Sequence, residues 1–240
     1  MRAEDRSVFD LPTRSCSSIE KYGVEPDNFT EIFEATGVQL GQVILIHGGY
    51  WRTEYDLSHL RPYAGALSDL GWRVHLVEYR RTPGEPDKYL SDIRAAIMHA
   101  KGGTLIGHSA GGHLALLAAD SQTSPLIKAV ITLAPVADLA TADALNLDEG
   151  AVRSFLGESA VNRPDFDPNL TRNTKVPVLI IHGIDDIRVP VELSRTLLAS
   201  YKGAGLDCQL IELEDTGHFE LIDYRAQPIE IVVEQLKKLS

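Results

Sequence analysis

The chain has 240 residues, of which 44% are hydrophobic and 24% charged, a composition that allows one sizeable globular core. Its formal net charge of −11 argues against nucleic acid or an anionic membrane surface as a partner. Cys16 and Cys208 are too few and too far apart for a disulfide framework or a cysteine-based zinc site. No signal peptide or membrane-spanning apolar stretch is apparent, so we expect a cytoplasmic protein.

The N-terminal region differs in character from the rest of the chain. Residues 1–28 carry prolines and scattered charge, which predicts an extended arm on the surface. Residues 29–34 mix β-favouring and charged side chains, which predicts an edge strand. We expect residues 29–240 to form a single domain.

Short apolar runs alternate with helical patterns along that domain. Several runs are continuous in Val, Ile and Leu, as in parallel strands that are covered on both faces. The predicted strands are 43–46, 73–79, 104–106, 129–133, 178–181 and 209–213, and helical stripes run over 90–97, 193–201 and 229–236. This pattern predicts an α/β fold with a doubly wound, mostly parallel sheet and a ligand site at the carboxyl ends of its strands.

Residues 138–175 interrupt the alternation. They contain several acidic residues, two glycines and two prolines, with a short helical pattern only at 151–156. A stretch of this length is too long for a plain connection between strands, so we expect a small cap over the site. The alternative is a surface insertion without a catalytic role.

The sequence Gly107-His108-Ser109-Ala110-Gly111 follows a predicted strand and opens a predicted helix. A Gly-x-Ser-x-Gly turn in this setting is typical of a nucleophile elbow, which exposes the serine hydroxyl above the sheet. The helix N-terminus beside it favours developing negative charge. We therefore expect Ser109 to be a nucleophile.

A serine nucleophile needs a base and an orienting acid, which in elbow-type folds follow in the order Ser, Asp or Glu, His. Of the eight histidines, only His218 lies on a loop after the last predicted strand, downstream of both other candidates. The acid comes from Asp185-Asp186, after strand 178–181, and we favour Asp186. We expect His182 to brace this loop and His59 to be a surface residue.

Backbone N–H donors for an oxyanion are expected from the loop His47-Gly48-Gly49-Tyr50-Trp51, directly after strand 43–46. The amide of Ala110, which follows the nucleophile, supplies a further donor. The histidines show no zinc-like spacing with carboxylates, so we expect no metal and no organic cofactor.

Four motifs together resemble the arylformamidase (kynurenine formamidase) branch of the α/β-hydrolases, which is related to the His-Gly-Gly esterases. They are His47-Gly-Gly-Tyr-Trp51, Tyr79-Arg80 with Pro83, Gly107-His-Ser-Ala-Gly-Gly-His-Leu114 and Gly217-His-Phe-Glu220. The resemblance spans residues 29–240 and implies a Ser109, Asp186 and His218 triad, with oxyanion amides at Gly49, Tyr50 and Ala110. The acid loop departs from it and is more similar to a general esterase.

The resemblance favours a small aryl formamide such as N-formylkynurenine as the acyl substrate, in an acyl pocket crowded by Tyr50 and Trp51. We expect Trp51, His108 and Phe219 to contact the substrate. Three alternatives stay open: a short-chain carboxylesterase, a non-catalytic ligand-binding protein of the same fold, and a metal-dependent formamidase for which the chain offers no ligands. A homodimer is also left open.

Overall fold

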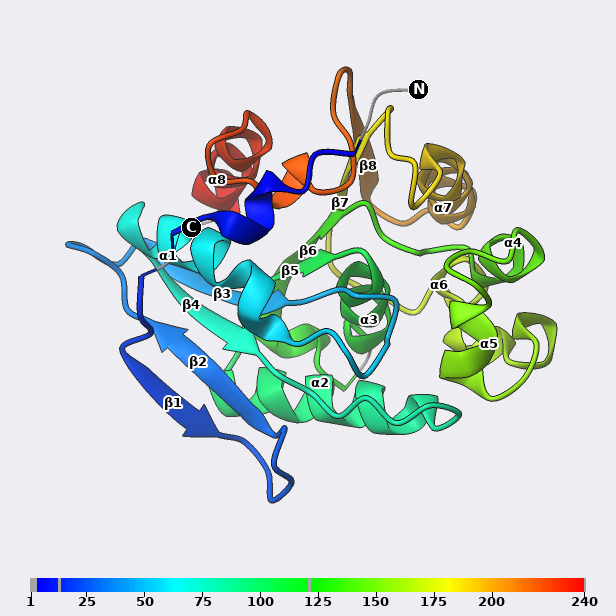
Figure 1. Cartoon of the computed structure of the whole chain (residues 1–240), viewed down its shortest axis with the longest axis horizontal. Coiled ribbons are helices and arrows are strands. Elements are labelled where there is room, and N and C mark those ends of the chain that lie inside the picture. The colour runs from blue at the N-terminus through cyan, green and yellow to red at the C-terminus, as the bar shows by residue number, and fades with distance from the viewer. Residues whose placement is uncertain (1–3, 13, 121, 240) are drawn as a thin grey trace.

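Within residues 4–12, 14–120 and 122–239, which the computed structural model describes, an eight-stranded sheet runs through the molecule (Figure 1). Its strand order is β1-β2-β4-β3-β5-β6-β7-β8. Strands β3 to β8 are parallel, whereas β1 and β2 are antiparallel to their neighbours. The strands are β1 Ser18–Lys21, β2 Phe29–Phe33, β3 Gly41–Ile46, β4 Trp72–Val77, β5 Gly103–His108, β6 Ile127–Leu133, β7 Val178–Gly183 and β8 Cys208–Leu213.

The six strands predicted from apolar runs are confirmed as β3 to β8, but the predicted edge strand is misplaced. Strand β2 is internal, because β1 pairs with it and forms the edge. Of the predicted arm 1–28, residues 1–3 and 13 lie outside the described residues, and the remainder contains β1 and the 3-10 helix Ser7–Asp10. The four residues of β1 are too few to show a strand pattern in sequence.

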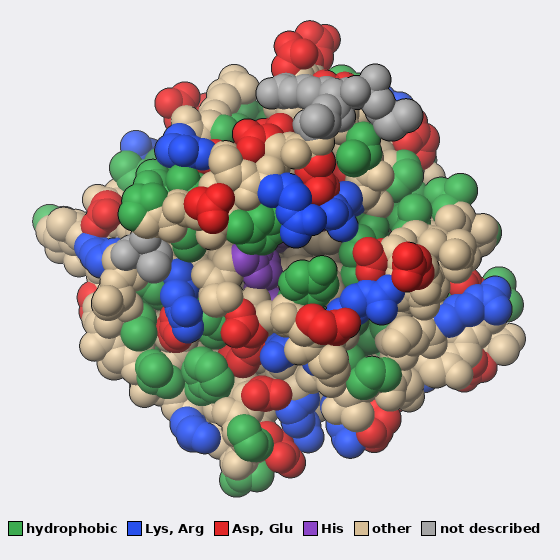
Figure 2. All heavy atoms as spheres, in the orientation of Figure 1, with side chains coloured by type: hydrophobic (Ala, Val, Ile, Leu, Met, Phe, Trp, Pro, Cys, Tyr) green, Lys and Arg blue, Asp and Glu red, His purple; other side chains and the backbone are tan. Residues whose placement is uncertain are grey.

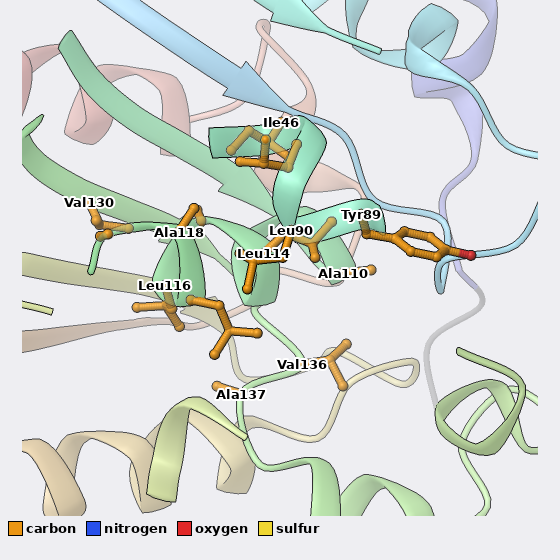
Figure 3. Close-up of a cluster of buried hydrophobic side chains, with 14 of the residues drawn as sticks. Ile46, Tyr89, Leu90, Ala110, Leu114, Leu116, Ala118, Val130, Val136 and Ala137 are labelled. Atoms are coloured by element: carbon orange, nitrogen blue, oxygen red, sulfur yellow. The ribbon is translucent and has the colours of Figure 1, made fainter. Parts of the chain in front are cut away.

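Helices cover both faces of the sheet and enclose two hydrophobic cores. One core lies beneath α2, α3 and α7, and the other beneath α1 and α8. Figure 3 shows part of the first core, where Leu114 of α3 lies beside Leu90 of α2. The main helices are α1 Arg61–Asp69, α2 Pro86–Ala100, α3 Ala110–Ala118, α7 Val191–Gly203 and α8 Pro228–Leu239. Helix α1 was not predicted, because its nine residues give only a short apolar stripe.

Besides two 3-10 helices, the insertion at residues 138–175 forms three short α-helices at one end of the sheet (Figure 1). They are α4 Leu139–Ala144, α5 Ala151–Leu156 and α6 Pro168–Thr171. Phe155 and Phe166 of this segment are buried in the same core as α2 and α3. The insertion is therefore fixed to the sheet by packing, and the turn between α4 and α5 is the part that reaches the candidate site.

Candidate active site

Ser109 lies at the sharp turn between β5 and α3, at the carboxyl end of the central strands. Its backbone has φ 56° and ψ −121°, a conformation that is costly for a residue with a Cβ. Its N–H donates to the carbonyl of Leu133 at the end of β6, with an N–O distance of 2.8 Å, which ties the turn to the sheet. The turn geometry is that of a nucleophile elbow.

Glycine is required at two positions of this turn because backbone segments approach closely. A Cβ on Gly107 would lie 2.4 Å from the carbonyl oxygen of Gly111. A Cβ on Gly111 would lie 2.3 Å from the carbonyl oxygen of Ile46, on the neighbouring strand β3. Both distances are far below van der Waals contact, so any larger residue would push α3 away from the sheet.

His218 and Asp186 are joined by a short hydrogen bond. The distance from His218 Nδ1 to Asp186 Oδ2 is 2.6 Å, and both side chains are buried. Asp186 follows β7 and His218 follows β8, so two neighbouring strand ends bring the pair together. Asp185 is exposed, and of the two adjacent aspartates it is Asp186 that contacts His218.

The carboxylate of Asp186 is held in its ionised form by its surroundings. Its Oδ1 accepts hydrogen bonds from the N–H groups of Arg188 and Val189, both at 2.8 Å. Burial raises the pKa of Asp186, but attraction to His218 and the contacts with His218 and His182 outweigh it, so the pKa falls well below its usual range. As expected from sequence, His182 braces the loop, since its Nε2 donates to the carbonyl of Val189 at 2.9 Å.

His108 contacts the backbone of His218. Its Nε2 lies 3.2 Å from the carbonyl oxygen of His218, and because a carbonyl only accepts, this nitrogen carries the proton. Burial and then the proximity of His218 lower the pKa of His108 well below its usual value, so the ring is neutral. His108 is thus a positioning residue that fixes the loop of His218.

The loop after β3 turns sharply beside Ser109. Gly49, Tyr50 and Trp51 have successive φ angles of 108°, 49° and 58°. The N–H groups of Gly49, Tyr50 and Ala110 donate no hydrogen bond to another described residue. Gly49 and Tyr50 line the same cavity as Ser109, so free donors are available there for an oxyanion.

Trp51 is not placed with the other expected substrate contacts. Its side chain is buried and stacks on Phe155 of α5, with ring centroids 4.6 Å apart. Its carbonyl accepts from the hydroxyl of Tyr89 at 3.1 Å. The successive left-handed residues of the loop turn this side chain into the core, so Trp51 supports the insertion rather than lining the cavity.

A buried ion cluster behind the loop was not predicted from the sequence. Glu78, directly after β4, accepts from His47 Nε2 at 3.1 Å, from the N–H of Leu57 at 3.2 Å and from Arg81. Burial raises the pKa of Glu78, but the hydrogen bond and charge of His47, followed by the charge of Arg81, lower it to about 2. The hydroxyl of Tyr79 donates to the carbonyl of His47 at 2.8 Å, which completes the support.

This cluster predicts an acid-sensitive contribution to stability. Because the folded pKa of Glu78 is about 2 against 4.5, its contribution is complete above pH 4.5 and is lost as the pH falls toward 2. By linkage, this pKa difference contributes at most about 3 kcal/mol to the free energy of unfolding. In urea unfolding, Glu78→Gln should be less stable than wild type at pH 7, and the gap should narrow from pH 4.5 to pH 3. A gap that is constant with pH would show that the pKa of Glu78 is the same in the folded and the unfolded protein.

The side chains enclose a cavity of about 50 Å³ that Ser109 and His218 both line. By the volume that one water requires, this space holds about three to five waters, so it suits a small group. His108 and Phe219, the other two expected substrate contacts, line this cavity, and a histidine is visible in the hollow of the surface in Figure 2. The full lining is Arg6, Phe9, Gly49, Tyr50, Tyr55, His59, His108, Ser109, Asp148, Arg188, His218 and Phe219.

Several lining residues were missed from the sequence. His59, expected at the surface, is partly buried, and burial followed by the charge of His47 lowers its pKa to about 4. Arg6 and Phe9 come from the N-terminal segment, and Asp148 from the turn of the insertion. None of these residues belongs to a sequence motif. Contacts between distant parts of the chain bring them to the cavity, so the sequence pattern did not indicate them.

The described part of the chain holds no group of three or more His, Cys, Asp or Glu side chains arranged to bind a metal ion. Likewise, none of its helices is both long and apolar enough to cross a membrane.

Solved structures of esterases have this fold. Esterase B from Lactobacillus rhamnosis aligns with a TM-score of 0.77 at 20% identity, covering 98% of this chain and 89% of that chain. An esterase from Thermogutta terrifontis, solved with propionate bound, aligns with a TM-score of 0.71 at 23% identity, covering 93% and 94%. The architecture is the α/β-hydrolase fold, as predicted. Within this class, the chain belongs to the BD-FAE family, which it matches over residues 33–201.

Curated relatives are also esterases. Esterase LipQ of Mycobacterium tuberculosis is 26% identical over 201 residues, which are 71% of this chain and 48% of LipQ. The chain spans about half the length of the curated relatives it matches.

Proposed function

We propose that this protein is a serine hydrolase that cleaves short-chain carboxylic esters through an acyl-enzyme. The observation that carries the proposal is the convergence of the Ser109 turn and the Asp186–His218 pair on one small cavity. Membership of the BD-FAE family and the esterase names of the relatives support the same chemistry.

The hydrogen bond to Asp186 places the proton of His218 on Nδ1, which leaves Nε2 free to accept one. In the proposed reaction, Nε2 takes the proton of the Ser109 hydroxyl as Oγ attacks the carbonyl carbon. Nε2 then returns this proton to the leaving alkoxide, and the acyl group stays on Oγ. A water, deprotonated in the same way, releases the acid and regenerates Ser109.

The tetrahedral intermediate carries a negative charge on the former carbonyl oxygen. We assign its stabilisation to the N–H groups of Gly49, Tyr50 and Ala110, which are free of other partners among the described residues. Donors of this kind contribute about 3–4 kcal/mol each in comparable sites. The pKa of the Tyr50 hydroxyl is raised by burial, so this hydroxyl stays protonated and donates to the carbonyl of Arg188 at 2.6 Å.

The size of the cavity predicts a limit on the acyl group. For 4-nitrophenyl esters, kcat/KM should fall at least about tenfold from acetyl to hexanoyl, because forcing extra methylenes into a filled space costs about 1–3 kcal/mol. Steady-state kinetics on the acetyl, butyryl and hexanoyl esters of the same phenol test this. A preference for the hexanoyl ester would contradict the assignment of the cavity to the acyl group.

A second candidate substrate is an aryl formamide. The sequence His47-Gly-Gly-Tyr-Trp51 favours it, and a formyl group is the smallest acyl group that this cavity could receive. Hydrolysis of N-formylkynurenine, measured beside the phenyl esters, separates the two candidates. The formamide is the better substrate if the protein is a formamidase, and it is cleaved poorly or not at all if the protein is an esterase.

The same substrate panel tests the non-catalytic alternative. If the purified protein cleaves no ester or formamide faster than a Ser109→Ala control, the proposal is wrong and the protein is a non-catalytic ligand-binding protein of the same fold.

A further inference from the structure

The N-terminal segment crosses the mouth of the cavity and is fixed there by specific contacts. Val8 is buried in the core beneath α1 and α8. The ring of Phe9 meets that of Phe219 edge to face, with centroids 4.8 Å apart. In Figure 1 this segment, drawn in dark blue, lies beside the orange segment that follows β8. The segment is therefore a wall of the candidate active site.

Phe219 is the residue directly after His218, and two guanidinium groups lie close to its ring. The Cζ atom of Arg188 lies 5.3 Å from the ring centroid and that of Arg6 lies 5.7 Å from it. Arg188 is paired with Glu4, through Nη2 to Oε2 at 2.9 Å and a second bond from Nε. No carboxylate of the described residues lies within salt-bridge distance of Arg6.

The charge at this mouth is opposite to that of the chain as a whole. The charged side chains that line the cavity, apart from the histidines, are Arg6, Arg188 and Asp148. Asp148 is neutralised by Arg52, and Arg188 by Glu4. One positive charge, that of Arg6, is left at the mouth of a protein whose net charge is −11.

Glu4 lies in a hollow next to the cavity, and its bonds to Arg188 show that this cavity-lining guanidinium binds a carboxylate. The hydrogen bond to Arg188 lowers the pKa of Glu4 against the effect of burial, and the charges of Arg188, Arg6 and His218 lower it further. Glu4 thus lies within the field of both guanidinium groups and of the candidate base. Glu4 belongs to neither hydrophobic core, and its segment is anchored separately by Val8, so a substrate group can replace its carboxylate without unfolding the core.

We propose that Arg6 and Arg188 form a carboxylate-binding site at the mouth of the active site, and that Glu4 competes with the substrate for it. The inference rests on the proposed function and deepens it: the preferred substrates are esters or formamides whose leaving group carries a carboxylate. Planar guanidinium groups bind carboxylates in two-point geometry, as Arg188 binds Glu4.

The test compares two acetyl esters, one with a carboxylate on its leaving group and the other with a neutral methyl ester in that place, and follows the release of acetate so that cleavage of the methyl ester group is not counted. They are 4-acetoxybenzoate and its methyl ester, which share the acetyl group and the ring. The ratio of their kcat/KM values is measured for wild type, Arg6→Gln, Arg6→Lys and Glu4→Gln. The two substrates differ in intrinsic reactivity, but this difference is the same for every variant. It therefore cancels when the ratio is compared between variants. The controls Arg195→Gln and Glu192→Gln change charges on α7, outside the cavity lining.

We expect Arg6→Gln to lower the ratio of anionic to neutral substrate about three- to tenfold, the effect of a partly screened charge pair. Arg6→Lys should restore most of it. Glu4→Gln should raise the ratio by a similar factor, because it removes the internal competitor. The two control variants should leave the ratio unchanged. For wild type, added salt should lower kcat/KM for 4-acetoxybenzoate more than for the methyl ester.

An equal effect of Arg6→Gln on both substrates, or a ratio that Glu4→Gln lowers, would overturn the proposal. Binding of benzoate, followed by NMR titration, separates its failure from that of the proposed function. Benzoate should bind Glu4→Gln more tightly than wild type, and Arg6→Gln more weakly, whether or not the protein turns over esters. Turnover of the methyl ester without these differences leaves the esterase proposal standing and refutes the anion site.

Discussion

Replacing Ser109 with alanine should lower kcat on 4-nitrophenyl acetate by about 10⁶-fold, the size of loss seen when the serine of a comparable triad is removed. The substitution deletes one hydroxyl and leaves the backbone as it is, since alanine meets the same strain at φ 56° as serine does. The melting temperature should therefore stay within a few degrees of wild type.

A matched control for this variant is Ser154→Ala on α5, where the serine is exposed and outside the cavity lining. It should keep full activity. If Ser109→Ala retains more than a small fraction of wild-type turnover while folded, another group is the nucleophile and the proposed mechanism fails.

Asp186→Asn should lower kcat by about 10⁴-fold, as the analogous change does in a serine protease. Asparagine can still accept from the N–H groups of Arg188 and Val189 through its oxygen. Its NH₂ group then faces His218 Nδ1, which must become an acceptor and shift its proton to Nε2. His218 in this tautomer cannot take a proton from Ser109.

Asp185→Asn is the control for this prediction, because Asp185 is adjacent but exposed. It should retain near wild-type kcat, with stability changed by no more than about 0.5 kcal/mol. Measuring kcat and melting temperature for both variants in one buffer shows which of the two aspartates orients His218. The reverse result, with Asp185→Asn inactive, would contradict the geometry of the loop after β7.

Features that depend on local sequence were predictable. The turn around Ser109 is specified by glycines within two residues of it, and the apolar runs of the parallel strands fix where each loop begins. Because parallel strands place their carboxyl ends at one edge, the loops that carry Asp186 and His218 were expected to meet. The order of the motifs along the chain was enough to predict this meeting.

Features that depend on distant contacts were not predictable. Arg6 and Phe9 reach the cavity because the burial of Val8 sets the course of their segment. No local sequence pattern predicts that course. Trp51 was expected at the substrate because it follows Tyr50. The left-handed backbone of that loop sends the two side chains in different directions, which the sequence does not show.

The central claim is that Ser109 becomes covalently acylated, and trapping with a 4-nitrophenyl alkylphosphonate tests it most directly. The inhibited protein is digested, and the modified residue is located by mass-spectrometric fragmentation. We predict one phosphonyl adduct, on Ser109, formed in step with the loss of activity and absent from Ser109→Ala. An adduct on any other residue that tracks the loss of activity, or inactivation with Ser109 unmodified, would contradict the proposed mechanism.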